Sequence, residues 1–284
     1  MLKFAFRNIF RQKGRMLLTL TVIVFGVTGL ILSGGFVQDI FIQLRDATIH
    51  SRLGHLQIYA KGYYEYGRRA PYDYMIPQPE ALGSQIEAWP GVESVMQRVS
   101  FSGLLNNGRT DVPVIGEGIE PDKEAAISTF FFIIDGQGLS GGDPDGLLLG
   151  EGVARSLNAA PGDYVTLLVN TPEGGLNTLD LRVTGIFRTF SKDFDDRAIR
   201  IPLASARSLL LTEDAHSLVI SLEETERTDH FAALLRQALE GKGYEVFTWL
   251  ELDDFYSKTV ALYDRQFGVL QLIILLIVLL SVMN

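Results

Sequence analysis

Two long apolar segments constrain this chain more than any other feature. Residues 16–38 contain 23 successive residues without a charge, which is about 34 Å of helix and enough to cross a bilayer. Residues 268–284 are also uncharged, yet as a helix they reach only about 25 Å, short of a hydrocarbon core of about 30 Å. We therefore expect one complete transmembrane helix. The second segment is either a tail anchor of minimal length or a spanning helix that continues beyond Asn284, and the rest of the sequence favours the second interpretation.

The charges give these segments an orientation. The net charge is −9, yet all five charged residues before Asp39 are basic, which leaves −14 for residues 39–284. Positive charge beside the first apolar segment places that end in the cytoplasm. The acidic remainder would repel phosphates, which argues against a nucleic-acid partner. A cleaved signal peptide with its site at residues 33–35 is the alternative, but the apolar region exceeds the usual length of about 7–15 residues.

The first 15 residues have the pattern of an amphipathic helix. Lys3, Arg7 and Arg11 are spaced by four, while apolar residues gather on the opposite side. Such a helix is suited to lie along the cytoplasmic membrane face. The alternative is an ordinary charged flank. The predicted basic face at the membrane interface consists of Lys3, Arg7, Arg11, Lys13 and Arg15.

Small residues recur along the first apolar segment. Thr19, Gly26 and Ser33 are spaced by seven, and small residues in register allow helices to approach closely in lipid. We interpret them as a helix-packing face. Gly26→Leu is accordingly expected to disturb assembly.

Between the membrane segments the sequence predicts an α+β extracytoplasmic domain. Strand–helix–strand patterns follow residue 54 and recur from residue 217. We interpret the two units as one subdomain that is split by an insertion. The predicted divisions are an amphipathic helix (1–15), transmembrane helix 1 with a stalk extension (16–50), the outer domain (51–250), and a stalk with the start of transmembrane helix 2 (251–284).

The insertion, at about residues 135–205, has short strands separated by turn signals, which indicate a small β-rich subdomain. One such turn lies between two predicted strands and is a candidate contact hairpin. It consists of Thr171, Pro172, Glu173, Gly174 and Gly175.

Patterns for covalent or metal chemistry are absent from the sequence. Without cysteine there is no disulfide, thiolate nucleophile or cysteine-ligated zinc. The sequence has no Walker phosphate loop and no dinucleotide fingerprint. The scattered histidines, His50, His55, His216 and His230, are interpreted as surface or satisfied polar residues, so His55→Ala should have little effect. The acidic cluster at residues 193–196 is interpreted as a solvated loop. We predict no catalytic, cofactor-binding or metal-binding residue, and no enzyme activity in this chain.

Several strings in a fixed order resemble one family. They are "RNIFRQKGR", "GHLQIYAKGYYE", "WPGVESV", "VIGEGIEPDKE", "LLLGEGVARSLNAAPGDYVTLL", "LRVTGIF" and "IPLASARSLL". Together they resemble the permease subunits of the lipoprotein-releasing and macrolide-exporter (MacB-type) ABC transporters, over nearly the whole chain. The stretch from Gly150 to Phe187 is the most specific.

The resemblance implies four membrane helices, with the large outer domain between the first and second. It also implies a bacterial inner-membrane location, a separate ABC ATPase that holds ATP and Mg²⁺, and a second permease protomer, identical or homologous. The implied function is to couple ATP hydrolysis by that partner to movements of the periplasmic domain, which exports or extracts a hydrophobic cargo such as a lipoprotein, lipid or drug. Membrane lipid and a periplasmic carrier or adaptor are further implied partners.

One departure from the family affects the carrier. Members that dock a periplasmic carrier have a long projecting hairpin, whereas the link at residues 170–180 is short here. Two other functions remain open on the sequence: a two-helix membrane sensor with an outer ligand-binding domain, and a transporter-like regulator of cell-wall hydrolases. A sensor would continue past Asn284 into a signalling helix, and a permease into two further apolar segments.

Overall fold

The computed structural model describes residues 13–67 and 69–283, in two compact units. The first unit comprises the described residues up to Arg45 together with those from Asp254 onward, and the second is Asp46–Asp253. Of the predicted amphipathic helix, residues 1–12 lie outside the described residues.

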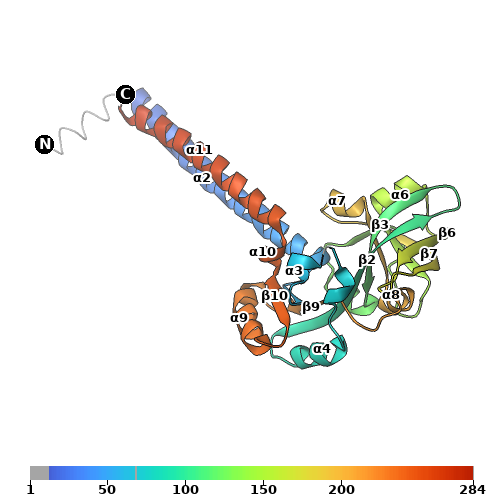
Figure 1. The fold of residues 1–284 in the computed structure, drawn as a ribbon. Coiled ribbons are helices and arrows are strands. Elements are labelled where there is room, and N and C mark those ends of the chain that lie inside the picture. Colours follow the sequence, from blue (N-terminus) through green and yellow to red (C-terminus); the bar gives the residue numbers. More distant parts are fainter. Residues whose placement is uncertain (1–12, 68, 284) are drawn as a thin grey trace. The chain divides into compact units, whose positions relative to one another are not determined.

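The first unit is a pair of helices, α2 (Lys13–Thr48) and α11 (Asp254–Met283), drawn in blue and red in Figure 1. Among the described residues, two helical stretches are long and apolar enough to cross a membrane, Met16–Leu53 and Tyr256–Leu280. Large apolar side chains of this unit stand exposed. They include Leu17, Phe25, Leu32, Leu272 and Leu280.

A seam of less exposed residues joins the two helices. On α2 these residues recur at intervals of three and four, which is the spacing of one helix face. They are Met16, Thr19, Ile23, Gly26, Leu30, Ser33, Val37, Ile40 and Leu44. A Cβ atom built on Gly26 would lie 3.5 Å from Cγ2 of both Ile274 and Val278. Gly26 therefore faces α11 in ordinary van der Waals contact.

In the second unit, one four-stranded antiparallel sheet is built from both ends of the domain. The strand order is β10-β1-β9-β2, with α4 and α9 connecting β1 to β2 and β9 to β10 (Figure 1). This is the split β-α-β arrangement of ferredoxin-like domains. The elements are β1 (Leu56–Ala60), α4 (Pro79–Glu87), β2 (Val92–Asn106), β9 (Ser217–Leu222), α9 (Thr228–Leu239) and β10 (Tyr244–Thr248).

The remaining strands close a circuit. β2 pairs with β3 through Val99–Asn106 and, on its other edge, with β6. From β3 the pairing continues through β8, β5 and β7 and returns to β6. These six strands therefore form a small barrel, and a further strand, β4, pairs with β7. The strands are β3 (Asp111–Ile119), β4 (Phe132–Gly136), β5 (Gly146–Gly150), β6 (Tyr164–Asn170), β7 (Leu176–Arg188) and β8 (Ala198–Pro202).

Each part has its own apolar core. In the split sheet, β-strand residues such as Ile58 and Ile220 pack against Phe231 and Leu235 of α9. Inside the barrel, Leu149, Leu167 and Ile199 are fully buried. The barrel helices are α6 (Glu151–Leu157), α7 (Lys192–Asp195) and α8 (Leu203–Leu210). The connecting elements are the π-helical turn η2 (Ile49–Leu53), α3 (Tyr63–Tyr66), η3 (Pro71–Tyr74), α5 (Pro121–Ile127), η4 (Thr225–Arg227) and α10 (Trp249–Leu252).

The α+β fold with a split subdomain and a β-rich part is confirmed. The β-rich part is larger than the stretch of residues 135–205 that the sequence marked. It also takes in β3 and the second half of β2. The reason is that β2 is a single 15-residue strand, whose first half pairs with β9 and whose second half pairs with β3 and β6.

Two of the histidines, His55 and His216, are buried. The burial of His55 corrects the prediction that His55→Ala has little effect. His55 is 1 % exposed, its Nδ1 accepts the backbone N–H of Leu222 at 3.0 Å, and its Nε2 lies 3.0 Å from Thr225 Oγ1. Alanine would leave a buried N–H without that acceptor, a loss that costs about 1–3 kcal/mol. His55 is thus a satisfied polar residue whose removal matters.

The acidic cluster after β7 is likewise not a solvated loop throughout. Asp195 is 3 % exposed, and its carboxylate accepts hydrogen bonds from the backbone N–H and the hydroxyl of Thr189. Burial raises the pKa of Asp195, and the two bonds from Thr189 oppose that rise. Asp195 therefore anchors the segment between β7 and β8.

His216 is the most deeply buried titratable group on the split sheet, and it makes stability depend on pH. It is fully buried, and its Nδ1 accepts the backbone N–H of Ser100 at 3.1 Å. Burial lowers the pKa of His216 from 6.5 to about 4. On acidification the unfolded chain takes up this proton first, so stability is full above pH 6.5 and falls as the pH drops toward 4.

We predict that the lowered pKa of His216 alone reduces the free energy of unfolding by about 3 kcal/mol when the pH falls from 6.5 to 4. His216→Asn removes the titration and keeps an acceptor, so its unfolding free energy should depend less on pH by that amount. Denaturant unfolding followed by tryptophan fluorescence measures it, because both tryptophans, Trp89 and Trp249, lie in the second unit. His230→Asn, at an exposed position, is the control. Parallel pH curves for wild type and His216→Asn would contradict the prediction.

Candidate functional site

The chain enters the domain through a buried π-helical turn. Residues Ile49–Leu53 follow α2, and Ile49 and Ser51 are almost completely buried. The turn ends at Gly54, which has φ +64° and whose N–H donates to Ile49 O. A Cβ atom at Gly54 would lie 2.5 Å from Val219 Cγ1, so only glycine fits there. The backbone is therefore fixed closely against β9.

The side chain of Arg98, in β2, binds a backbone carbonyl of this turn. Its Nη1 donates to the carbonyl of Arg52, while Nε and Nη2 donate to the two carboxylate oxygens of Glu124 at 2.6 and 2.9 Å. The bidentate pair fixes both distance and orientation. Because Arg98 and Glu124 are 5 % and 3 % exposed, the pair is held in a largely water-excluded interior.

Arg200 of β8 binds the preceding carbonyl. Its Nη2 donates to Ser51 O at 3.4 Å, and its Nε donates to Glu117 Oε2 at 3.0 Å. Its Nη1 lies 3.8 Å from Glu124, and its guanidinium lies 4.4 Å from the ring centroid of Phe131. Two strands thus hold two successive carbonyls of the entering chain.

These four charged side chains form a neutral set, the buried charge network of Arg98, Glu117, Glu124 and Arg200. Burial alone would lower the pKa of Arg98, but Glu124 and Glu117 raise it above its ordinary value. Burial alone would raise the pKa of Glu117, but Arg200 and Arg98 hold it below its ordinary value. Both shifts favour the charged forms of Arg98 and Glu117, and each of these two groups depends on its partners in the network for compensation.

The chain leaves the domain beside the point where it enters. Thr48 Oγ1 donates to Asp253 Oδ2 at 3.1 Å, and both residues are buried. The N–H of Asp253 donates to Trp249 O, and the N–H of Trp249 donates to His55 O, each at 3.0 Å. Thr248 and Glu251 form a capping box that starts α10. Entry and exit are therefore joined by hydrogen bonds within the domain.

None of the residues singled out from the sequence is a member of this network. Of the basic set, Lys3, Arg7 and Arg11 fall outside the described residues, and Lys13 and Arg15 belong to the first turn of α2. Thr19, Gly26 and Ser33 lie on the seam toward α11.

The predicted contact hairpin is a tight turn between β6 and β7. Thr171 is buried, and its Oγ1 accepts the N–H of Gly175 at 3.1 Å. Pro172, Glu173, Gly174 and Gly175 are exposed. Thr171 therefore holds the turn, and the four residues after it form its accessible surface.

Sequence reasoning missed the buried charge network. A signal was present in β8, because Arg200 stands between Ile199 and Ile201 in a strand whose five residues are all buried. Its acceptors come from β3, α5 and the turn after α2, and these partners are set by tertiary structure. Among residues 13–67 and 69–283 we find no cluster of potential ligands that could hold a metal ion.

Comparisons with known proteins converge on one family. The sequence matches the model of the MacB-like periplasmic core domain over residues 16–238. The lipoprotein-releasing system transmembrane protein LolE of Haemophilus influenzae is 28% identical over 156 residues, which are 49% of this chain and 37% of LolE. The match thus spans little more than a third of that relative's length.

A solved structure shares the fold. The periplasmic region of MacB from Actinobacillus actinomycetemcomitans aligns with a TM-score of 0.51 and 15% sequence identity. The alignment covers 75% of this chain and 94% of that chain.

We predict that breaking the buried charge network is costly in a non-additive way. Arg98→Met leaves Glu124 with a single partner, and Glu124→Met leaves Arg98 without its bidentate acceptor. Each should lower the unfolding free energy by about 3–5 kcal/mol, and the double variant should lose clearly less than the sum. Tryptophan-monitored denaturant unfolding measures all three. Lys192→Met, in an exposed ion pair with Asp196, is the control and should cost little. Additive losses would contradict the coupling.

Proposed function

Because this chain belongs to the family of the MacB-like periplasmic core domain, we propose that it is part of an ABC transporter permease. In this proposal α2 and α11 cross the bacterial inner membrane, the N-terminus is cytoplasmic, and Asp46–Asp253 lies in the periplasm. ATP and Mg²⁺ are held by a separate ATPase subunit, and a second permease protomer completes the transporter.

The observation that carries the proposal is the attachment of the chain where it enters the domain. The carbonyls of Ser51 and Arg52 are bonded to Arg200 and Arg98, which belong to different strands. β2 takes part in both the split sheet and the barrel. A displacement of the turn after α2 would therefore act on both the split sheet and the barrel. It would act through these hydrogen bonds, with no flexible linker between the turn and the two strands.

The cargo is proposed to be hydrophobic, such as a lipoprotein, lipid or drug. The similarity to LolE, a lipoprotein-releasing system protein, favours a lipoprotein among these. The turn between β6 and β7 has only five residues, which gives little surface for docking a carrier. We therefore propose that the transporter extracts or exports the cargo without docking a periplasmic carrier at this turn.

The orientation is tested with alkaline phosphatase inserted after Gly174, in the exposed turn of residues 172–175. An insertion at Gly150, near the middle of the domain sequence, would instead disrupt the fold, because this residue is buried at the end of β5. The inserted phosphatase should be active in cells, since its disulfides form in the periplasm. The same phosphatase joined ahead of Met1 should be inactive. A reversed activity pattern would overturn the topology and the proposed function together.

Coupling is tested by Gly26→Leu in the complete permease, purified with its ATPase and reconstituted in nanodiscs. Leucine would enter the space occupied by Ile274 and Val278, and overpacking of this kind costs about 1–3 kcal/mol. Lipoprotein release per ATP hydrolysed should fall severalfold. Gly29→Leu is the matched control, because a Cβ atom there meets nothing within 4 Å. If no ATPase copurifies with the wild-type permease, a sensor or a hydrolase regulator becomes the better account.

A further inference from the structure

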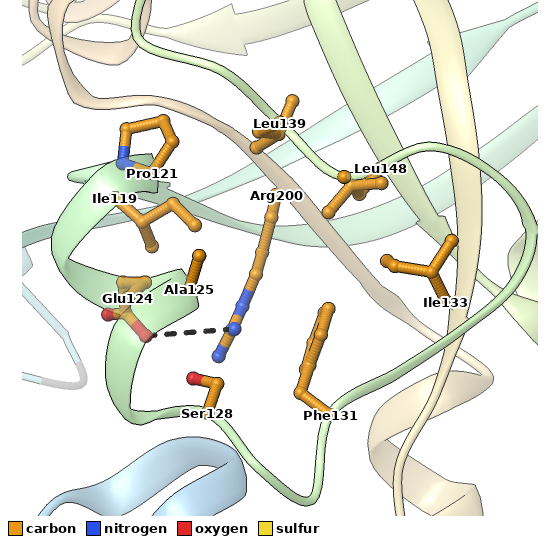
Figure 2. A pocket seen from close by; sticks show the side chains of 11 residues that line it. Ile119, Pro121, Glu124, Ala125, Ser128, Phe131, Ile133, Leu139, Leu148 and Arg200 are labelled. Atoms are coloured by element: carbon orange, nitrogen blue, oxygen red, sulfur yellow. Dashed lines mark ion pairs between the residues drawn. The ribbon is translucent and has the colours of Figure 1, made fainter.

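A cavity lies against the buried charge network. It is a partly open cavity with a volume of about 170 Å³. Its lining comes from the end of β3, from α5, β4, β5 and β8, and from the segments on either side of β4 (Figure 2). Its walls are mainly apolar, with Ile119, Leu139 and Leu148 among them. The guanidinium of Arg200 points between Glu124 and the ring of Phe131, as Figure 2 shows.

The charges at this cavity are already compensated. Arg200 is paired with Glu117 at 3.0 Å and lies 3.8 Å from Glu124, and Glu124 is bound bidentately by Arg98. The network as a whole is neutral, so a charged occupant would add an uncompensated charge to a buried site. The cavity therefore favours a ligand without net charge.

The volume and the lining of the cavity restrict the class of ligand further. A cavity of roughly 150 Å³ lined by apolar side chains binds benzene, so a cavity of about 170 Å³ admits one ring. Phe131 forms part of the wall, and its ring stacks on Phe187 with centroids 4.5 Å apart. Because Arg200 and Phe187 already lie against this ring, a ring-shaped ligand would meet it edge-on, and edge-to-face aromatic contacts add about 0.5–1.5 kcal/mol to area burial.

We propose that the cavity between α5, β4, β5 and β8 is a binding site for a small uncharged aromatic molecule of about one ring. The ligand would touch Phe131 and Arg200, the second of which also holds the carbonyl of Ser51. The site would therefore place a bound molecule next to the point where the chain enters the domain. This inference goes beyond the proposed function and does not depend on it.

The test is photolabelling of the full chain in detergent with 3-trifluoromethyl-3-phenyldiazirine, an uncharged single-ring probe. Trypsin should release residues 124–155 as one peptide, because no lysine or arginine lies between Lys123 and Arg155. This peptide contains most of the cavity lining. Residues 16–45, from α2, form a second tryptic peptide, which is labelled from the surrounding detergent and serves as the internal reference.

The cavity is filled with Ala125→Phe, since Ala125 lines it. The matched control is Ala126→Phe, the next residue of α5, which is exposed and does not line the cavity. Labelling of peptide 124–155 relative to peptide 16–45 should fall about tenfold in Ala125→Phe, which corresponds to roughly 1.4 kcal/mol of binding free energy. Ala126→Phe should label like wild type.

A second measurement needs no variant. Excess unlabelled toluene should suppress labelling of peptide 124–155, because the cavity is a saturable site. Labelling of peptide 16–45 should stay unchanged, because partition of the probe into detergent is not saturable. Labelling of peptide 124–155 that toluene does not suppress would overturn the proposal. So would equal labelling in folded Ala125→Phe and Ala126→Phe.

Discussion

The structure of the domain depends on the need to compensate charges that are buried away from water. Arg98, Arg200 and Glu124 are nearly inaccessible, while the side chain of Glu117 is 14% exposed. An unpaired charge in such a place is strongly unfavourable. β2, β3, β8 and α5 must therefore keep one mutual arrangement, since each contributes one member of the set. The same guanidiniums also satisfy Ser51 O and Arg52 O, so compensation inside the domain also fixes the chain where it enters.

β2 explains how a domain with two cores behaves as one unit. Its first half belongs to the split sheet, and its second half closes the barrel between β3 and β6. Cross-strand hydrogen bonds make such a strand stiff along its length. The bond between Thr48 and Asp253 adds a direct link between the entering and leaving segments.

The helix pair follows a different physical rule. Many of its large apolar side chains are exposed, as expected of residues that face lipid, where leaving the lipid tails for another helix brings little gain. Close approach at Gly26 against Ile274 and Val278 supplies van der Waals contact instead. The match to the MacB-like periplasmic core domain runs over residues 16–238, from α2 into the second unit.

The sequence by itself determined the features that have a local cause. Apolar length predicted two helices long enough to cross a membrane, and period-two and helical patterns predicted the split α+β fold. Tertiary structure alone decided the buried charge network. Arg200 between two isoleucines gave a sign of burial in the sequence, but its partners lie on other elements that only folding brings together. It also decided the burial of His55 and the full extent of the barrel, since strand pairing and solvent exclusion arise only when distant segments meet.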